Sequence, residues 1–325
     1  MRPKHGQDDR ALPERIAKAI ARAGLCSRRE AEMWIAAGRV AVNGEVIASP
    51  ARNVTAADRI VVDGRPLPTR ERTRLFLYHK PRGLLTTHAD PAGRPTIFAA
   101  LPAGLPRLVS VGRLDINTEG LLLLTNDGSL ARTLELPATG WLRRYRVRAH
   151  GRVAQDQLDG LRAGTTIDGI RYGPIEATVD RGQGSNVWLT FAIREGKNRE
   201  VKNVLGHLGL KVSRLIRVSF GPFQLGDLAA GEITEVKTRT LRDQIGERVA
   251  ALAGADFSGP ITAREAPPAP PRAQPTADGG PRRAQPGQRD AKRKRRRVDP
   301  ERIGQPELAR REKRRGRRGA RGERR

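Results

Sequence analysis

Cysteine, aromatic residues and long hydrophobic runs are all scarce in this chain of 325 residues. The single cysteine, Cys26, excludes an internal disulfide framework, and we expect it to be a small buried residue. No apolar run approaches the roughly 20 residues that a membrane-spanning helix needs, and the N-terminus has no signal-peptide pattern. We therefore expect a cytoplasmic protein that does not cross a membrane.

The motifs of the common cofactor and metal enzymes are also missing. The five histidines are scattered, and none belongs to an HxxxH, HExxH or Cys/His cluster of the kind that binds zinc. The chain has no GxGxxG after a strand, no Walker-type GKS or GKT, and no GxSxG nucleophile turn. The sequence therefore predicts no cofactor and no metal, and any reaction should need neither a redox agent nor an activated donor.

Acidic residues are few relative to basic ones, which gives the chain a formal net charge of +27. Residues 261–325 hold 22 lysine and arginine residues against 8 acidic ones, and they contain no Phe, Trp or Tyr. Such a segment buries too little apolar surface to fold, so we predict a disordered basic tail over 255–325. The excess of basic residues elsewhere indicates a polyanionic partner such as nucleic acid, although a charged surface can also serve solubility alone.

The first folded unit should contain two helices followed by strands. A helical pattern begins near Arg15. The run SRRE, from Ser27 to Glu30, is a capping box that predicts the start of a second helix. Asn43-Gly44 between two apolar runs predicts a β-hairpin.

The second folded unit mixes strand and helix patterns without strict alternation. Strand patterns occur in LFLY, RLVSV, YRVRAHG, IEATVD, NVWLTFAI and SRLIRVSFGPF, and helical patterns occur around 128–135, 154–162, 199–208 and 241–254. Several strands are half-polar, so we expect an α+β fold with a mixed, largely antiparallel sheet rather than a doubly wound one. The expected organisation is a flexible N-terminus at 1–12, a small domain at 13–67, a linker at 68–74, a second domain at 75–254 and the tail at 255–325.

Basic residues gather at the start of the second helix. Arg28 and Arg29 lie in its first turn, where cations oppose the helix dipole unless an anion such as a phosphate also binds there. Ordinary solvated arginines explain the same pattern equally well. The run RIAKAIARAGLCSRREAEMWIAAGRVAVNGEVI, continued to RIVVDG, resembles the S4 RNA-binding domain. That resemblance implies that Ser27, Arg28, Arg29 and Arg39 contact structured RNA, mostly through phosphate and shape.

The stretch SVGRLDINTEG places carboxylates on a turn just ahead of an apolar run, LLLL. Asp115 follows a strand on a loop, where reactive groups are common, although Asp in a glycine-containing turn more often forms the turn or caps a helix. Glu119 is a weaker candidate, which we interpret as a structural residue of the turn. Asp127-Gly128 predicts a plain turn.

Two other stretches can supply partners for Asp115. In EGKNREVKNVLGHLG we expect Asn198 to cap a helix that carries Arg199 and Lys202 in its first turn. Both cations are poorly placed there unless a carboxylate or phosphate is near. In WLRRYRVRAHG, Tyr145 lies on a strand among arginines, where half-buried packing is the simpler interpretation.

Together these motifs resemble the RsuA/RluB-type family of ribosomal RNA pseudouridine synthases. The resemblance extends from about Leu75 to Val236, through HKPRGLLTT, GRLDINTEGLLLLTNDG, YRVRAHG and GKNREVKNVLGHLGLKVSRLIRVSFGP. It implies that the protein isomerises uridine to pseudouridine in ribosomal RNA, without a cofactor, on a base flipped out of its stack. We expect the protein to be a monomer. The GKNREVK form and the Arg-rich tail favour 23S RNA of the large subunit over 16S RNA of the small subunit as the target.

The same resemblance assigns roles to residues. It implies that Asp115 is the catalytic group, that Tyr145 packs against the target base and that Lys202 partners Asp115. Asp115 can attack C1′ or remove a C2′ proton, and both routes stay open. Arg113 and Arg199 are expected to contact RNA.

One position departs from the family pattern, and one alternative class stays open. Asn203 stands where a second basic residue is usual, which weakens the expected RNA contact at that point. The alternative is a non-catalytic RNA-binding or ribosome-assembly protein. Such a protein would be free to lose Asp115, Tyr145 and Lys202, and all three are present.

Overall fold

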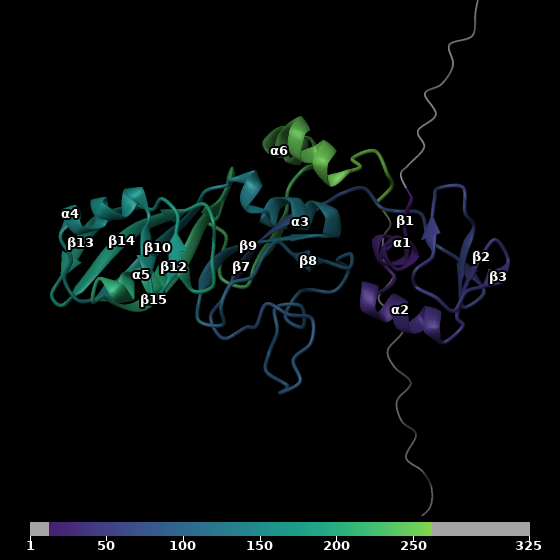
Figure 1. Cartoon of the computed structure of the whole chain (residues 1–325), viewed down its shortest axis with the longest axis horizontal. Helices are drawn as coiled ribbons and strands as arrows, with labels where there is room; N and C mark the ends of the chain where they lie inside the picture. The colour runs from purple at the N-terminus through teal and green to yellow at the C-terminus, as the bar shows by residue number, and fades with distance from the viewer. Residues whose placement is uncertain (1–12, 262–325) are drawn as a thin grey trace, which may run out of the picture. The chain divides into compact units, whose positions relative to one another are not determined.

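A computed structural model describes residues 13–261 of the chain. The predicted flexible N-terminus at 1–12 and the predicted basic tail from residue 262 onward lie outside the described residues. The described part contains a small N-terminal unit and a larger unit from Leu75 onward, both drawn in Figure 1. None of the helices within 13–261 is long and apolar enough to cross a membrane.

The N-terminal unit has the two helices and the strands that the sequence predicts. Its elements are β1 (Glu14–Arg15), α1 (Ile16–Arg22), α2 (Arg28–Ala36), β2 (Val40–Val42), β3 (Glu45–Val46), β4 (Asn53–Val54), β5 (Ile60–Val62) and β6 (Arg65–Pro66). The capping box is present, since the Glu30 amide donates to Ser27 Oγ at 3.1 Å and the Ser27 amide donates to Glu30 Oε2 at 2.6 Å. Asn43 (φ 54°) and Gly44 (φ 88°) form the tight turn between β2 and β3. Cys26 is buried in an aliphatic core that belongs to this unit.

The larger unit is built on a nine-stranded sheet. Its elements are β7 (Leu75–Lys80), β8 (Val109–Ser110), β9 (Glu119–Thr125), α3 (Gly128–Glu135), η1 (Pro137–Thr139), β10 (Arg143–His150), α4 (Gln155–Asp159), η2 (Gly160–Ala163), β11 (Thr165–Ile167), β12 (Ile170–Tyr172), β13 (Glu176–Gln183), β14 (Asn186–Ile193), α5 (Glu200–His207), β15 (Lys211–Phe220), β16 (Phe223–Gln224), β17 (Ile233–Glu235) and α6 (Thr238–Ala253). The strand order is β13-β14-β10-β15-β9-β7-β17, with β8 beside β9 and β16 beside β15. Among these strands, β9 and β15 pair in parallel and the other neighbours pair antiparallel. The predicted α+β fold with a mixed, largely antiparallel sheet is confirmed.

The apolar run LLLL lies in β9 and is buried on both faces of the sheet. Successive side chains of a strand point to opposite faces. Leu122 and Leu124 therefore pack in a core with α4, η2 and α5, while Leu121 and Leu123 pack in a second core with α3 and α6. Figure 1 shows α3 and α6 next to each other on one side of the sheet. Burial on both faces makes β9 a rigid base for the loop at 111–118 that precedes it.

Asp127 has two roles that the predicted plain turn does not include, since it caps a helix and forms a buried ion pair. It is 3% exposed and caps α3, because its Oδ1 accepts from the amides of Ser129 (2.9 Å) and Leu130 (3.3 Å). Its Oδ2 accepts from Arg70 Nη2 at 2.7 Å and from Thr73 Oγ1 at 2.8 Å. A buried carboxylate needs such partners, because an unpaired charge in the interior is costly.

The larger unit also extends beyond the predicted boundaries of 75 and 254. The Thr73 amide donates to Asp256 O at 2.5 Å, and the Arg72 amide donates to Pro260 O at 3.1 Å. Residues 255–261, which composition assigns to the tail, therefore pair with the segment assigned to the linker. A few backbone hydrogen bonds between irregular segments leave no periodic pattern, which is why the sequence places both boundaries too far inward.

We expect Gly120→Ala to destabilise the larger unit by roughly 2 kcal/mol or more. Gly120 has a φ of +101°, and a Cβ at this position would lie 2.3 Å from the Arg217 carbonyl oxygen, across the parallel β9–β15 pair. Thermal unfolding would measure the loss. Gly128→Ala is the matched control, since an added Cβ there meets no atom within 4 Å. Equal Tm values for Gly120→Ala and the parent protein would contradict the expectation.

Candidate active site

Asp115 lies on the loop at 111–118, which joins β8 to β9 and is fixed at several points. Thr86 Oγ1 donates to Leu114 O at 2.9 Å, and the Leu114 side chain is buried. The Thr118 amide donates to Asp115 O at 3.0 Å and closes the turn. The Asp115 side chain itself remains 38% exposed. A carboxylate on a constrained loop is therefore accessible to a substrate.

Lys80, the last residue of β7, supports this loop from inside the protein and is not predicted from the sequence. Its side chain is fully buried, and Nζ donates to the carbonyl oxygens of Pro81 (3.0 Å), Ile116 (3.3 Å) and Thr118 (3.0 Å). Burial lowers the pKa of Lys80 to about 8, although the nearby carboxylates oppose this shift. Lysine is rarely buried, so the sequence HKPRG carries no sign of this role.

We expect the activity supported by this loop to fall as the pH rises through about 8, the pKa of Lys80. The protonated ammonium has three donors for three carbonyls, and the neutral amine has two. The pKa of Lys80 is lower in the folded protein than the ordinary 10.5, so the unfolded chain binds this proton more tightly. The contribution of Lys80 to the free energy of unfolding therefore increases as the pH rises from about 8 to 10.5. A pH–rate profile combined with Tm measurements tests this, and an activity that stays flat to about pH 9.5 would contradict it.

Glu119, the first residue of β9, forms an ion pair with an arginine and is therefore not free to react. Both of its carboxylate oxygens accept from Arg214 of β15, at 3.1 and 2.8 Å, and the side chain is 12% exposed. This contact joins the start of β9 to β15. The geometry agrees with the interpretation of Glu119 as a structural residue.

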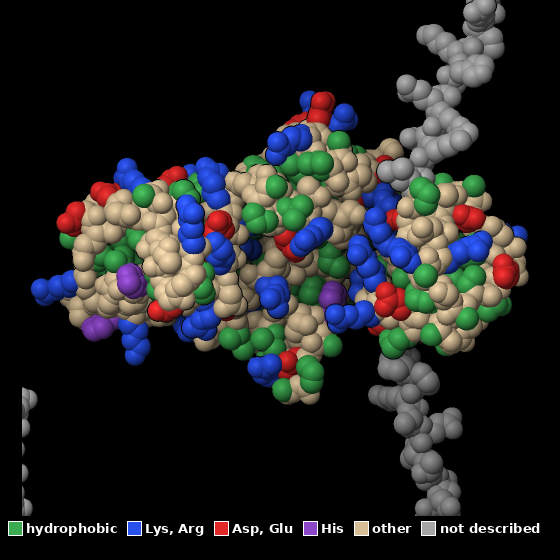
Figure 2. Space-filling model, in the orientation of Figure 1, with side chains coloured by type: hydrophobic (Ala, Val, Ile, Leu, Met, Phe, Trp, Pro, Cys, Tyr) green, Lys and Arg blue, Asp and Glu red, His purple; other side chains and the backbone are tan. Residues whose placement is uncertain are grey.

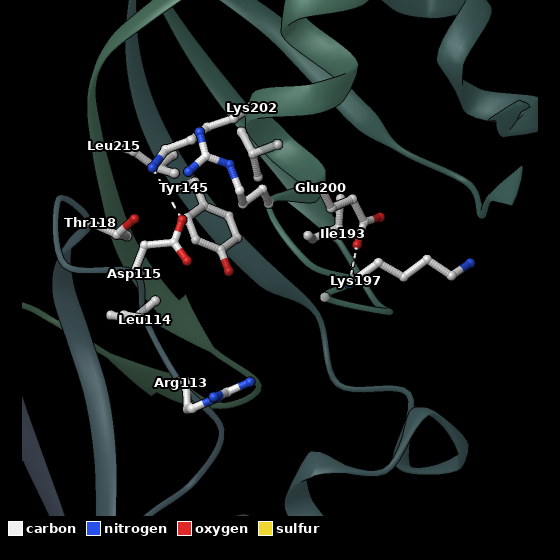
Figure 3. A pocket seen from close by; sticks show the side chains of 13 residues that line it. Arg113, Leu114, Asp115, Thr118, Tyr145, Ile193, Lys197, Glu200, Lys202 and Leu215 are labelled. Atoms are coloured by element: carbon white, nitrogen blue, oxygen red, sulfur yellow. Dashed lines mark hydrogen bonds and ion pairs between the residues drawn. The ribbon is translucent and has the colours of Figure 1, made fainter. Parts of the chain in front are cut away.

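The pocket beside Asp115 brings the three predicted catalytic residues together. Lys202 in α5 places Nζ 3.1 Å from Asp115 Oδ2, and Tyr145 reaches the pocket from the buried face of β10. Figure 3 shows Lys202 and Tyr145 beside the Asp115 carboxylate, with Arg113 at the opposite end of the pocket from Lys202. The cavity has a volume of about 70 Å³, and its other lining residues include Arg113, Leu114, Thr118, Ile193, Arg199, Glu200 and Leu215. Residues 13–261 contain no cluster of three His, Cys, Asp or Glu side chains that could hold a metal ion.

The start of α5 differs from the prediction that Asn198 caps it. Arg199 occupies the N-cap position with a φ of +51° and makes no side-chain capping bond. The buried Glu200 side chain instead accepts from the Lys197 amide at 2.7 Å, and burial raises the pKa of Glu200. Asn198 contributes its carbonyl, which accepts from Asn203 Nδ2 at 3.3 Å. Glu200 thus lines the pocket without being revealed by the sequence, and it fixes the turn from which Lys202 projects.

The four predicted RNA-contact residues of the N-terminal unit differ in availability. Arg28 and Arg29 are exposed in the first turn of α2. Ser27 Oγ is engaged in the capping box. Arg39 donates two hydrogen bonds to Asp63, at 2.8 and 2.5 Å. Arg28 and Arg29 are therefore better placed than Ser27 and Arg39 to meet a phosphate.

Each of the two units matches a known protein family. The S4 domain family matches residues 14–60, and the RNA pseudouridylate synthase family matches residues 74–207. An RNA pseudouridine synthase of Rickettsia typhi is 44% identical over 235 residues, which cover 72% of this chain and 96% of that protein. Ribosomal large subunit pseudouridine synthase B of Pseudomonas aeruginosa is 42% identical over 252 residues, which cover 74% of this chain and 65% of that protein. A pseudouridylate synthase crystal structure is similar with a TM-score of 0.51 and 28% identity, over 73% of this chain and 100% of that one.

Proposed function

Because the chain belongs to the RNA pseudouridine synthase family, we propose that it converts a specific uridine of 23S ribosomal RNA to pseudouridine, with Asp115 as the catalytic group. The large-subunit target is supported by relatives that carry the name ribosomal large subunit pseudouridine synthase B. The observation that carries the catalytic assignment is the ion pair of Asp115 with Lys202 in one pocket with Tyr145.

The reaction needs a group that acts at the sugar and a pocket that holds the base. The N1–C1′ bond breaks, a C5–C1′ bond forms, C5 loses its proton and N1 gains one, so the isomerisation balances without a cofactor. Asp115 either attacks C1′ or removes a C2′ proton, and both routes require the same carboxylate. Tyr145 packs against the base, whose removal from its stack costs a few kcal/mol. Lys202 holds the carboxylate in place and offsets its charge near phosphates.

The basic surface holds the RNA mainly through its phosphates. Lys and Arg side chains are spread over much of the face seen in Figure 2. Such contacts release counterions, so the affinity falls as salt rises. The proposed RNA contacts are Ser27, Arg28, Arg29 and Arg39 in the N-terminal unit and Arg113 and Arg199 at the pocket. We further propose that the protein acts as a monomer in the cytoplasm and that the basic segment beyond residue 261 adds affinity.

The test is to incubate the full-length protein with unmodified 23S and 16S RNA and to map pseudouridine by carbodiimide modification and reverse transcription. Modification of one or a few positions in 23S RNA is the expected result. Modification of 16S RNA alone would replace the proposed target by the small-subunit alternative. If neither RNA is modified, the proposal of catalysis fails and the non-catalytic RNA-binding alternative stands.

A further inference from the structure

A second, larger cavity adjoins the pocket of Asp115. It has a volume of about 410 Å³ and shares Arg113, Tyr145, Gly196 and Lys197 with that pocket. The charged residues that line it are Arg113, Arg132, Arg143, Lys197 and Arg217, together with Glu135 and Glu195. Both carboxylates are engaged, since Glu195 pairs with Lys197 at 2.5 Å and Glu135 Oε1 accepts from the Gly112 amide at 2.7 Å. The cavity wall therefore carries a clear excess of positive charge.

Two of these arginines are buried, and neither has an ion-pair partner among residues 13–261. Arg143 is 6% and Arg217 is 3% exposed, and their guanidinium carbons lie 4.7 and 5.0 Å from the centroid of the Phe220 ring. Burial lowers the pKa of both groups. Buried charges usually have a counter-charge, because the protein interior solvates them poorly. Arg143 Nη1 donates to the carbonyl oxygens of Trp141 and Arg194, which carry no net charge. Two guanidinium groups at a cavity wall, without a counter-charge in the described structure, therefore favour an anionic ligand.

Arg217 contacts the Tyr145 side chain and also has a buried donor without a hydrogen-bond partner among the described residues. Its Nε donates to Leu121 O at 2.7 Å, whereas its buried Nη2 has no hydrogen-bond partner within the described part of the chain. Buried N–H groups without a partner are rare. A guanidinium group presents its donors as a planar fork that matches the oxygens of a phosphate. The donor without a partner therefore favours a ligand that carries a phosphate group.

We propose that this cavity binds a phosphodiester of the substrate RNA, adjacent to the uridine whose base packs on Tyr145. Tyr145 lines both cavities, so a nucleotide can place its base on one side of the ring and a neighbouring phosphate on the other. Arg217 and Arg132 bind the phosphate, and the anchored strand presents C1′ to Asp115. This inference rests on the proposed function, because it takes RNA as the ligand.

The test follows the Nε–H resonance of Arg217 in the ¹⁵N-labelled full-length protein by NMR, assigned through its loss in Arg217→Lys. Uridine 5′-phosphate, uridine 3′-phosphate, inorganic phosphate and uridine are titrated separately. At least one nucleotide should shift the resonance saturably, and uridine should not. Single-stranded RNA should displace the nucleotide. The overturning results are that neither nucleotide shifts the resonance, or that inorganic phosphate saturates it and RNA does not displace that phosphate.

Two surface variants keep the test independent of any folding defect in Arg217→Lys. Arg132→Ala removes an exposed guanidinium from the cavity wall and should weaken nucleotide binding by about fivefold or more. Arg144→Ala removes an exposed charge from β10 away from the cavity and should leave the affinity unchanged. Equal affinities for these two variants overturn the proposal. If the resonance shifts but rRNA stays unmodified, the anion site stands and the proposed function is wrong. If rRNA is modified but the resonance does not shift, only the anion site is wrong.

Discussion

Asp115→Asn is expected to lower pseudouridine formation by about four orders of magnitude or more while the fold and the RNA affinity are retained. Asparagine has the shape of aspartate, but it can neither attack C1′ nor accept a C2′ proton. The ion pair with Lys202 involves a side chain that is 38% exposed, and such pairs contribute about 0–1 kcal/mol. The Tm should therefore change by a few degrees at most. Release of the C5 proton from RNA labelled with tritium at that position measures the rate directly.

Glu119→Gln is the matched control for Asp115→Asn, because it neutralises the other carboxylate near the loop. Its partner is Arg214, and the substitution removes charge from that pair without touching the pocket. We expect a loss of less than about tenfold, which corresponds to the roughly 1 kcal/mol of a weakened hydrogen bond. If Glu119→Gln eliminates the reaction and Asp115→Asn does not, the catalytic assignment is wrong.

Lys80→Met is expected to lower the rate by about 10²–10³-fold, although Lys80 is a positioning residue that does not line the pocket of Asp115. Methionine retains the length of the side chain and removes all its donors. The carbonyls of Pro81, Ile116 and Thr118 then lose a buried partner. Each unsatisfied carbonyl costs about 1–3 kcal/mol, which is offset in part because no charge is buried any longer. The loop that carries Asp115 shifts as a result, and the reacting groups lose their alignment.

The pH–rate profile distinguishes this positioning role from a purely structural one. The parent protein should lose activity as the pH rises through about 8, and Lys80→Met should lack that step because the titrating group is gone. Lys211→Met, at an exposed position of β15, is the control for loss of a lysine charge and should retain both the rate and the step. Parental activity in Lys80→Met, with the alkaline step intact, would exclude Lys80 as the anchor of the loop.

Local features of the fold could be predicted from the sequence because they depend on near neighbours. Ser27 and Glu30 are three residues apart in the capping box, and Asn43 and Gly44 are adjacent in the hairpin turn. The strands and helices of the larger unit follow from the period of the apolar residues. The proximity of Asp115 and Lys202 has no such local cause. We expected this proximity from the resemblance to a known family, and the structure places the two residues together.

Most of the side chains whose roles sequence analysis missed carry a buried charge. Lys80, Asp127 and Arg217 have charged side chains of types that usually face solvent, and each is buried here by strands or helices distant in the sequence. Arg217 lies in SRLIRVSFGPF, where the alternation of polar and apolar residues predicts a strand but does not reveal which arginine points inward. Glu200 is similar, because its burial depends on the turn that contains Arg199. A buried charge is determined by tertiary contacts, and no period in the sequence encodes it.

The parallel pairing of β9 with β15 has a consequence for the order in which the protein becomes active. The ion pair of Asp115 and Lys202 joins residues 87 positions apart, and the bond from Arg217 to Leu121 spans 96. Contacts of such long sequence separation form slowly, because a long loop must close before they contribute. During synthesis, the loop of Asp115 leaves the ribosome well before either partner strand or helix. A growing chain therefore cannot complete the proposed active site until α5 and β15 have emerged and packed against the loop of Asp115.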